Sequence, residues 1–182
     1  MPAADEQQLI LQAKDGNPDA FRRLVERYMK RTYDIAYNFV GSHDDAEDIA
    51  QEAFVRVHRS LGSFRGESEF STWLHRIVTN LSINRAGEKK RQSQREMRAS
   101  DVEHLPDHHG GRGESSDVQF HVEQALHELP TLQRAVVILR HLNGLSTREV
   151  SDILRCSDGT VKTHLHRGLK KMKSMLDFLK DE

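Results

Sequence analysis

The stretch LSTREVSDILRCSDGTVKTHLHRGLKKMK, residues 145–173, decides the fold. It opens with a capping box, because Ser146 and Glu149 stand three residues apart and each can satisfy a free amide at a helix start. After a short turn, Ser157 can cap a second, longer helix. Apolar residues recur along that helix at helical spacing, namely Val161, Leu165, Leu169, Met172, Leu176 and Leu179. This pattern predicts a helix-turn-helix.

The face of the second helix opposite this apolar stripe is polar and basic. It presents Thr160, Lys162, Thr163, His166, Arg167 and Lys170. Thr160 and Lys162 lie near the helix start, where free amides and the positive end of the helix dipole attract phosphates. A helical hairpin with a solvated basic face is the simpler alternative. Because the caps, the turn, the stripe and the basic face agree, we expect this unit to bind DNA.

The rest of the chain is also rich in helix signals. Asn17 is a candidate N-cap followed by Pro18, and apolar residues then share one face as far as Gly41. Asp44 with Glu47 forms an acidic cap pair that opens a second helix, and a third apolar stripe follows. No stretch alternates with period two for long enough to predict a strand. The sequence therefore predicts an all-α fold.

One segment breaks the helical pattern. Residues 86–117 contain only three bulky apolar side chains, which are Met97, Val102 and Leu105. Such a segment cannot bury enough surface to offset the entropy of ordering it. The expected division of the chain is a small helical domain at 1–95, a flexible linker at 96–117 and a helix-turn-helix domain at 118–182.

The charge is unevenly distributed along the chain. The 182 residues carry 27 basic and 28 acidic side chains, which gives a net charge of −1. Residues 71–100 nevertheless hold seven basic and two acidic side chains, and residues 140–182 hold nine and six. Two basic segments favour two contacts with a polyanion such as a nucleic acid, and solvated helix faces are the alternative.

Several protein classes are excluded or disfavoured. The longest apolar run, residues 135–139, is far shorter than the roughly 20 residues that span a bilayer, and the N-terminus lacks the features of a secretory signal. The single cysteine, Cys156, excludes a disulfide framework. The eleven histidines include no His-Glu-x-x-His pattern. We therefore expect a cytoplasmic protein that is not an enzyme and that holds no metal or cofactor.

A loop flanked by aromatic residues precedes the first basic segment. Phe64, Phe70 and Trp73 surround the polar residues 65–69, and a basic helix follows. Aromatic side chains beside positive charge suit single-stranded nucleic acid, because every base offers a face for stacking. The alternative interpretation is that Phe70 and Trp73 belong to the core.

These motifs, in this order, resemble the bacterial extracytoplasmic-function (ECF) sigma factors, which are two-domain specificity subunits of RNA polymerase. Residues 45–54, DAEDIAQEAF, resemble the family's polymerase-binding helix. Phe64-Arg65-Gly66 and residues 70–74 resemble its promoter-melting loop and the helix start beyond it. Residues 129–140, 144–146 and 159–163 resemble its −35 domain. The chain departs from the family at Asn84, often an aspartate there, and at Ser151 and Arg155, often a small residue and a glycine.

The resemblance implies a role for each block. The residues implied to bind core polymerase are Asp45, Asp48, Gln51, Glu52 and Phe54. Those implied to contact the −10 element, partly as single-stranded DNA, are Phe64, Arg65, Phe70, Trp73, Arg76, Asn80 and Asn84. Those implied to contact duplex DNA at the −35 element are Thr160, Lys162, Thr163, His166, Arg167 and Lys170. The resemblance further implies a stress-response initiation factor that an anti-sigma factor holds inactive.

A stand-alone helix-turn-helix regulator is the main rival hypothesis. Residues 1–85 would then form a sensing or dimerising domain, and a dimer would bind a palindrome without polymerase. That hypothesis gives no role to the acidic segment 44–52 or to the aromatic loop.

Overall fold

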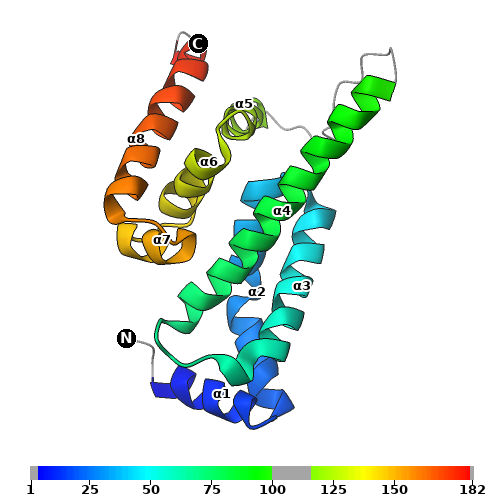
Figure 1. Ribbon diagram of the computed structural model, residues 1–182, viewed down its shortest axis with the longest axis vertical. Coiled ribbons are helices and arrows are strands. Elements are labelled where there is room, and N and C mark those ends of the chain that lie inside the picture. The colour runs from blue at the N-terminus through cyan, green and yellow to red at the C-terminus, as the bar shows by residue number, and fades with distance from the viewer. Residues whose placement is uncertain (1–3, 100–115, 181–182) are drawn as a thin grey trace.

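The computed structural model describes residues 4–99 and 116–180, and within these ranges every regular element is a helix (Figure 1). The N-terminal part holds α1 (Ala4–Lys14), α2 (Pro18–Val40), α3 (His43–Ser60), the short turn η1 (Leu61–Ser63) and α4 (Phe70–Ala99). The C-terminal part holds α5 (Ser116–His127), α6 (Thr131–Val137), the π-helical turn η2 (Ile138–Leu142), α7 (Thr147–Leu154), α8 (Asp158–Met175) and η3 (Asp177–Lys180). The prediction of an all-α fold is confirmed.

Helix extends into both ends of the segment expected to be a linker. α4 continues to Ala99, and α5 begins at Ser116. The range 96–117 is therefore helical at its first four and last two positions. Its central residues, 100–115, lie outside the described part of the chain.

The N-terminal domain is a bundle of α2, α3 and α4, with α1 lying across its lower end in Figure 1. The apolar stripes of these helices meet in a core whose fully buried side chains include Leu24, Ile35, Phe39, Ile49 and Leu74. Each such side chain contributes about 1.5–3 kcal/mol by leaving water. This core fixes the direction in which the outer faces of α3 and α4 point.

Local signals fix the ends of α2 and the start of α3. The side chain of Asn17 accepts hydrogen bonds from the amides of Asp19 and Ala20, at 3.0 and 3.1 Å. Gly41 ends α2 with a φ of +66°, in the left-handed region that glycine adopts easily. The cap of α3 is Ser42 rather than the expected Asp44, because the Ser42 hydroxyl accepts from the third helical amide.

The predicted helix-turn-helix is confirmed in α7 and α8. The Ser146 hydroxyl accepts from the amide of Glu149 at 3.2 Å, and the Glu149 carboxylate accepts from the amide of Ser146 at 2.7 Å. Ser157 caps α8 by accepting from the amide of Thr160 at 3.1 Å. Arg155 lies in the turn with a φ of +52°, a conformation that costs a non-glycine residue roughly 1–2 kcal/mol.

The two domains contact each other through α2 and α4 on one side and η2 and α7 on the other. Arg31 donates to the backbone carbonyl of Asn143 at 2.9 Å, and Arg76 donates to that of Asp152 at 2.7 Å. His75 is only 2% exposed, and neither of its ring nitrogens has a hydrogen-bond partner. The contact between the domains therefore adds polar contacts to a cluster of buried apolar side chains that continues from one domain into the other.

Gly168 sets the distance between α8 and α6. A Cβ atom at this position would lie 2.9 Å from Cγ2 of Val137, which is closer than side-chain atoms approach. We expect Gly168→Ala to lower the free energy of unfolding by about 1–3 kcal/mol, because the two helices must separate. Gly159→Ala, which makes only an ordinary contact at 3.7 Å, is the matched control in the same helix. Urea titrations of both variants test this, and equal effects would contradict it.

His75 makes the stability of the fold depend on pH. Burial lowers the pKa of His75 from 6.5 to about 4, with Arg31 adding to this effect and Glu149 opposing it. The unfolded chain therefore binds a proton between these values that the folded chain does not, so stability falls as the pH drops from about 6.5 towards 4. We expect a loss of about 2 kcal/mol between pH 7 and pH 5 in urea titrations.

The variant His75→Leu supplies the control for that titration. This variant lacks the titrating imidazole. Between pH 7 and pH 5 it should therefore lose about 2 kcal/mol less stability than the wild type. The same pH dependence in both proteins would contradict the assignment to His75.

Candidate functional site

The outer face of α8 is free to meet a partner. Lys162, Thr163, His166, Arg167 and Lys170 are exposed, and Thr160 is half-buried beside the cap. The structure thus places all six residues predicted for −35 contact at the start or on the outer face of one helix. No acidic side chain among the described residues pairs with the three cations of this set. Their charge is therefore available to a polyanion.

The outer face of α3 is acidic, as the sequence predicts. Asp48, Gln51 and Glu52 are exposed and share one side of the helix. Glu52 also pairs with Arg56 one turn on, at 2.6 Å. Phe54, predicted with them, is buried in the bundle.

Asp45 lies one turn before Asp48 on α3, but it is not part of the exposed acidic face. It is buried, its Oδ1 accepts from Arg85 at 2.9 Å and its Oδ2 pairs with Lys89. Burial alone would raise the pKa of Asp45, but the ammonium of Lys89 and its other partners outweigh burial and lower it. Asp45 therefore fastens the start of α3 to α4, and it does not present its carboxylate to solvent.

An apolar groove of about 350 Å³ adjoins the acidic residues. It is lined by Phe21, Met29, Gln51, Phe54, Val55, His58 and Arg59. Val55 is 47% exposed, on a helix whose other apolar residues are buried. Val55 is not among the predicted site residues, although an apolar residue outside the buried stripe of a helix is the signal that identifies it. The polar side chains in this lining are Gln51, His58 and Arg59. Val55 lies one turn after Gln51 and Glu52, so the apolar groove and the acidic face are neighbours on α3, and together they suit an amphipathic helix with basic edges.

The aromatic residues around residues 65–69 form one cluster. The ring of Phe64 lies 5.8 Å from that of Phe70 and 5.0 Å from that of Trp73. Phe64 is 9% exposed and Phe70 is 2% exposed, so Phe70 is a core residue as the alternative interpretation held. Arg65 is exposed and Trp73 is half-buried. The accessible parts of this region are therefore the loop itself and one side of Trp73.

Arg76, Asn80 and Asn84 follow at four-residue spacing along α4, which places them on one face of the helix. Asn80 and Asn84 are exposed. Arg76 is half-buried because it donates to the carbonyl of Asp152 in α7. The C-terminal domain thus covers one end of this face.

Metal chemistry finds no support among these side chains. In the described ranges, no group of three or more His, Cys, Asp or Glu residues is arranged to hold a metal ion.

Comparison with known proteins gives this arrangement a family. Residues 24–92 match the Sigma-70 region 2 family, and residues 120–172 match Sigma-70, region 4. The chain is 36% identical over 176 residues to the ECF RNA polymerase sigma factor SigW of Bacillus subtilis (strain 168), covering 92% of this chain and 94% of that protein. This chain belongs to the ECF sigma factors. It is also 31% identical over 180 residues to the RNA polymerase sigma-H factor of Pseudomonas aeruginosa, covering 94% and 93% of the two chains.

Two solved structures share the fold of this ECF sigma factor. CnrH, in complex with the cytosolic domain of CnrY, matches with a TM-score of 0.72 and 25% identity over 95% of this chain and 97% of CnrH. RpoE of Bartonella quintana, solved with the anti-sigma factor NepR, matches with a TM-score of 0.68 and 24% identity, covering 86% and 96%.

Family membership sets the general role of the molecule. As an ECF sigma factor, it is a transcription initiation factor whose partners are core RNA polymerase and promoter DNA. The region 2 match spans α2 to most of α4, and the region 4 match spans most of α5 to α8. The rival hypothesis of a stand-alone regulator is not supported.

Asp45 and Asp48 separate a structural from a surface role within one helix. We expect Asp45→Asn to lower the free energy of unfolding by about 1–2 kcal/mol, because it leaves Arg85 and Lys89 beside a neutral group. Asp48→Asn is the matched control, since Asp48 is exposed and its loss should leave stability unchanged. Urea titrations at pH 7 measure both values. A larger loss for the Asp48 variant would contradict the placement of Asp45.

Proposed function

We propose that the acidic face and groove of α3 dock on the coiled coil of the largest subunit of core polymerase. Asp48, Gln51 and Glu52 would meet basic side chains, and the groove beside Phe54 would take an apolar one. Asp45 would contribute by holding the start of α3 in place through Arg85 and Lys89.

We propose that the loop at residues 64–69 and the outer face of α4 engage the −10 element. A base flipped from the stack needs an aromatic or apolar pocket, in which the half-buried Trp73 would stack on the base with Phe64 and Phe70 packed behind it, while Arg65 would meet the backbone. Along α4, Arg76, Asn80 and Asn84 would follow the non-template strand. Arg76 must release the carbonyl of Asp152 to do so.

We propose that α8 enters the major groove at the −35 element. Lys162 and Arg167 would contact phosphate or guanine, while Thr163 and His166 would lie nearer the base edges. Thr160 at the helix start and Lys170 farther along would anchor the helix to the DNA backbone. The alternating exposure along this one helix supports the assignment.

One observation carries the proposal as a whole, namely that a single chain presents an apolar groove beside acidic side chains, a row of polar side chains and a basic face on three different helices. The division we propose is a −10 domain at 1–95, a connecting segment at 96–117 and a −35 domain at 118–182. Each domain alone would bind DNA weakly, and the connection makes the second contact intramolecular.

We further propose that an anti-sigma factor holds this chain inactive. RpoE was solved with the anti-sigma factor NepR, and CnrH was solved with the cytosolic domain of CnrY. Such a partner would cover the same polymerase- and DNA-facing surfaces.

No helix in the described part of the chain is long and apolar enough to cross a membrane. We propose action in the cytoplasm, in a stress response, without catalysis by the chain itself and without a cofactor.

Two variants test the division of labour between the domains. We expect Asp48→Arg to weaken binding to core polymerase about tenfold, because it reverses charge on the docking face. Arg167→Ala should leave core binding intact and weaken binding of the holoenzyme to a −35 duplex by about 1–3 kcal/mol. Sizing-column co-elution with core and fluorescence anisotropy with the duplex measure the two affinities.

The contrast between these variants is the decisive result. Loss of core binding in the Arg167 variant, or unchanged core binding in a folded Asp48 variant, would contradict separate sites for polymerase and for the −35 element.

A further inference from the structure

The first helix packs where the −10 loop leaves the bundle. Leu9 and Ile10 of α1 are buried, and Lys14 lies half-buried in its last turn. The Nζ of Lys14 donates to the backbone carbonyl of Phe64 and lies 5.7 Å from the centre of the Phe64 ring. A single ammonium therefore contacts both the backbone and the side chain at the first residue of the loop.

Phe64 sets the direction in which the loop leaves the bundle, because both its backbone and its ring are held in place. Its amide donates to the carbonyl of Leu61 at 3.0 Å, and its ring is held by Phe70 and Trp73. The peptide carbonyl held by Lys14 is the one that joins Phe64 to Arg65, so its orientation fixes where the exposed residues begin. Beyond this carbonyl, Gly66 adopts a left-handed backbone conformation with a φ of +73°. Arg65 and Glu67 form an ion pair at 3.8 Å, and both side chains are exposed.

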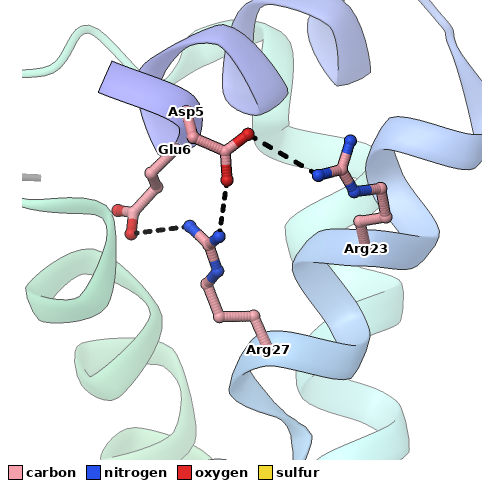
Figure 2. Close-up of polar contacts among 4 residues, drawn as sticks. All are labelled: Asp5, Glu6, Arg23 and Arg27. Carbon is pink, nitrogen blue, oxygen red and sulfur yellow. Dashed lines mark hydrogen bonds and ion pairs between the residues drawn. The ribbon is translucent and has the colours of Figure 1, made fainter. Parts of the chain in front are cut away.

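Ion pairs hold α1 against α2 at its other end, as Figure 2 shows. Asp5 pairs with Arg27 at 2.7 Å and with Arg23 at 3.6 Å, and Glu6 pairs with Arg27 at 3.5 Å. Each of these partly exposed pairs is weak by itself, but Arg27 joins two of them into one network.

The start of α1 also reaches the aromatic cluster. Burial, and then the Glu6 carboxylate beside its hydroxyl, raise the pKa of Tyr28, whose ring lies 5.3 Å from that of Phe70. The helix thus contacts the loop directly at Phe64, through Lys14, and is linked to Phe70 only through Tyr28 of α2. Its residues 4–14 lie outside the range 24–92 that matches region 2.

We propose that α1 positions the −10 loop and that Lys14 is the positioning residue, because it fixes the Phe64 carbonyl from which Arg65 and the base-capturing pocket extend. This inference rests on the proposed −10 role of the loop. A charge-assisted hydrogen bond to a carbonyl is worth more than a neutral one, and the ring of Phe64 beneath the ammonium adds to it. Lys14 acts in this account through the loop and does not contact DNA.

The test uses holoenzyme assembled from core polymerase and the full chain. Its probe is a forked fragment of a promoter that this holoenzyme transcribes, duplex at −35 and with the −10 non-template strand single. We expect Lys14→Met, which keeps the apolar stem, to weaken fork binding about tenfold. Lys14→Arg should recover most of this affinity. Lys30→Met, at an exposed lysine of α2, is the matched control and should match the wild type.

Three further readouts separate positioning from other roles. Core binding and −35 duplex binding of Lys14→Met should equal those of the wild type, because the loop alone is disturbed. The slope of fork affinity against salt concentration should also be unchanged. If Lys14→Met is destabilised, Lys14→Gln, whose amide can still donate a hydrogen bond, carries the test and should fall between Lys14→Met and the wild type.

Two results would overturn the inference while leaving the proposed function in place. One is wild-type fork affinity in a folded Lys14→Met holoenzyme. The other is a loss of affinity in which the salt slope falls by about 0.7, because that change marks a lost phosphate contact on single-stranded DNA. A wild-type holoenzyme that transcribes the promoter but does not bind the fork would overturn the proposed −10 role of the loop, and this inference with it.

Discussion

The burial of Phe64 and Phe70, on either side of residues 65–69, is the constraint on which the proposed −10 face of this molecule depends. Because both rings are packed against Trp73 and the bundle, the polar residues between them can stay exposed without losing a defined path. α4 begins at Phe70, so the same anchor sets the rotation of that helix. The positions of Asn80 and Asn84 on its outer face follow from it.

The contact between the domains is of a different kind. It uses arginine side chains of α2 and α4 that donate to backbone carbonyls of the C-terminal domain, and it buries His75 without a hydrogen-bond partner. Hydrogen bonds of this kind contribute about 1.5–3 kcal/mol each, and an orphaned polar group costs a similar amount. If Arg76 contacts DNA as proposed, its bond to Asp152 must break, whereas the aromatic anchor of the loop can stay in place.

The sequence predicts local features well and long-range ones poorly. The capping box at Ser146 and Glu149, the Asn17 cap and the basic face of α8 depend on residues a few positions apart, so their pattern is visible in the chain. The role of Asp45 depends on Arg85 and Lys89, about forty residues away in the sequence. No residue near Asp45 in the sequence predicts these partners. The contact of Arg76 with Asp152 and the bond from Lys14 to Phe64 are equally invisible, because the packing of whole helices creates them.

The central claim is that this chain gives core polymerase its choice of promoter. The most direct test is transcription by purified bacterial core polymerase from a pool of genomic fragments, with and without the chain. The account predicts new, discrete start sites that share sequence elements near −10 and −35. Sequence-specific binding of the free chain to duplex DNA, without polymerase binding or new start sites in a preparation free of any anti-sigma factor, would contradict it.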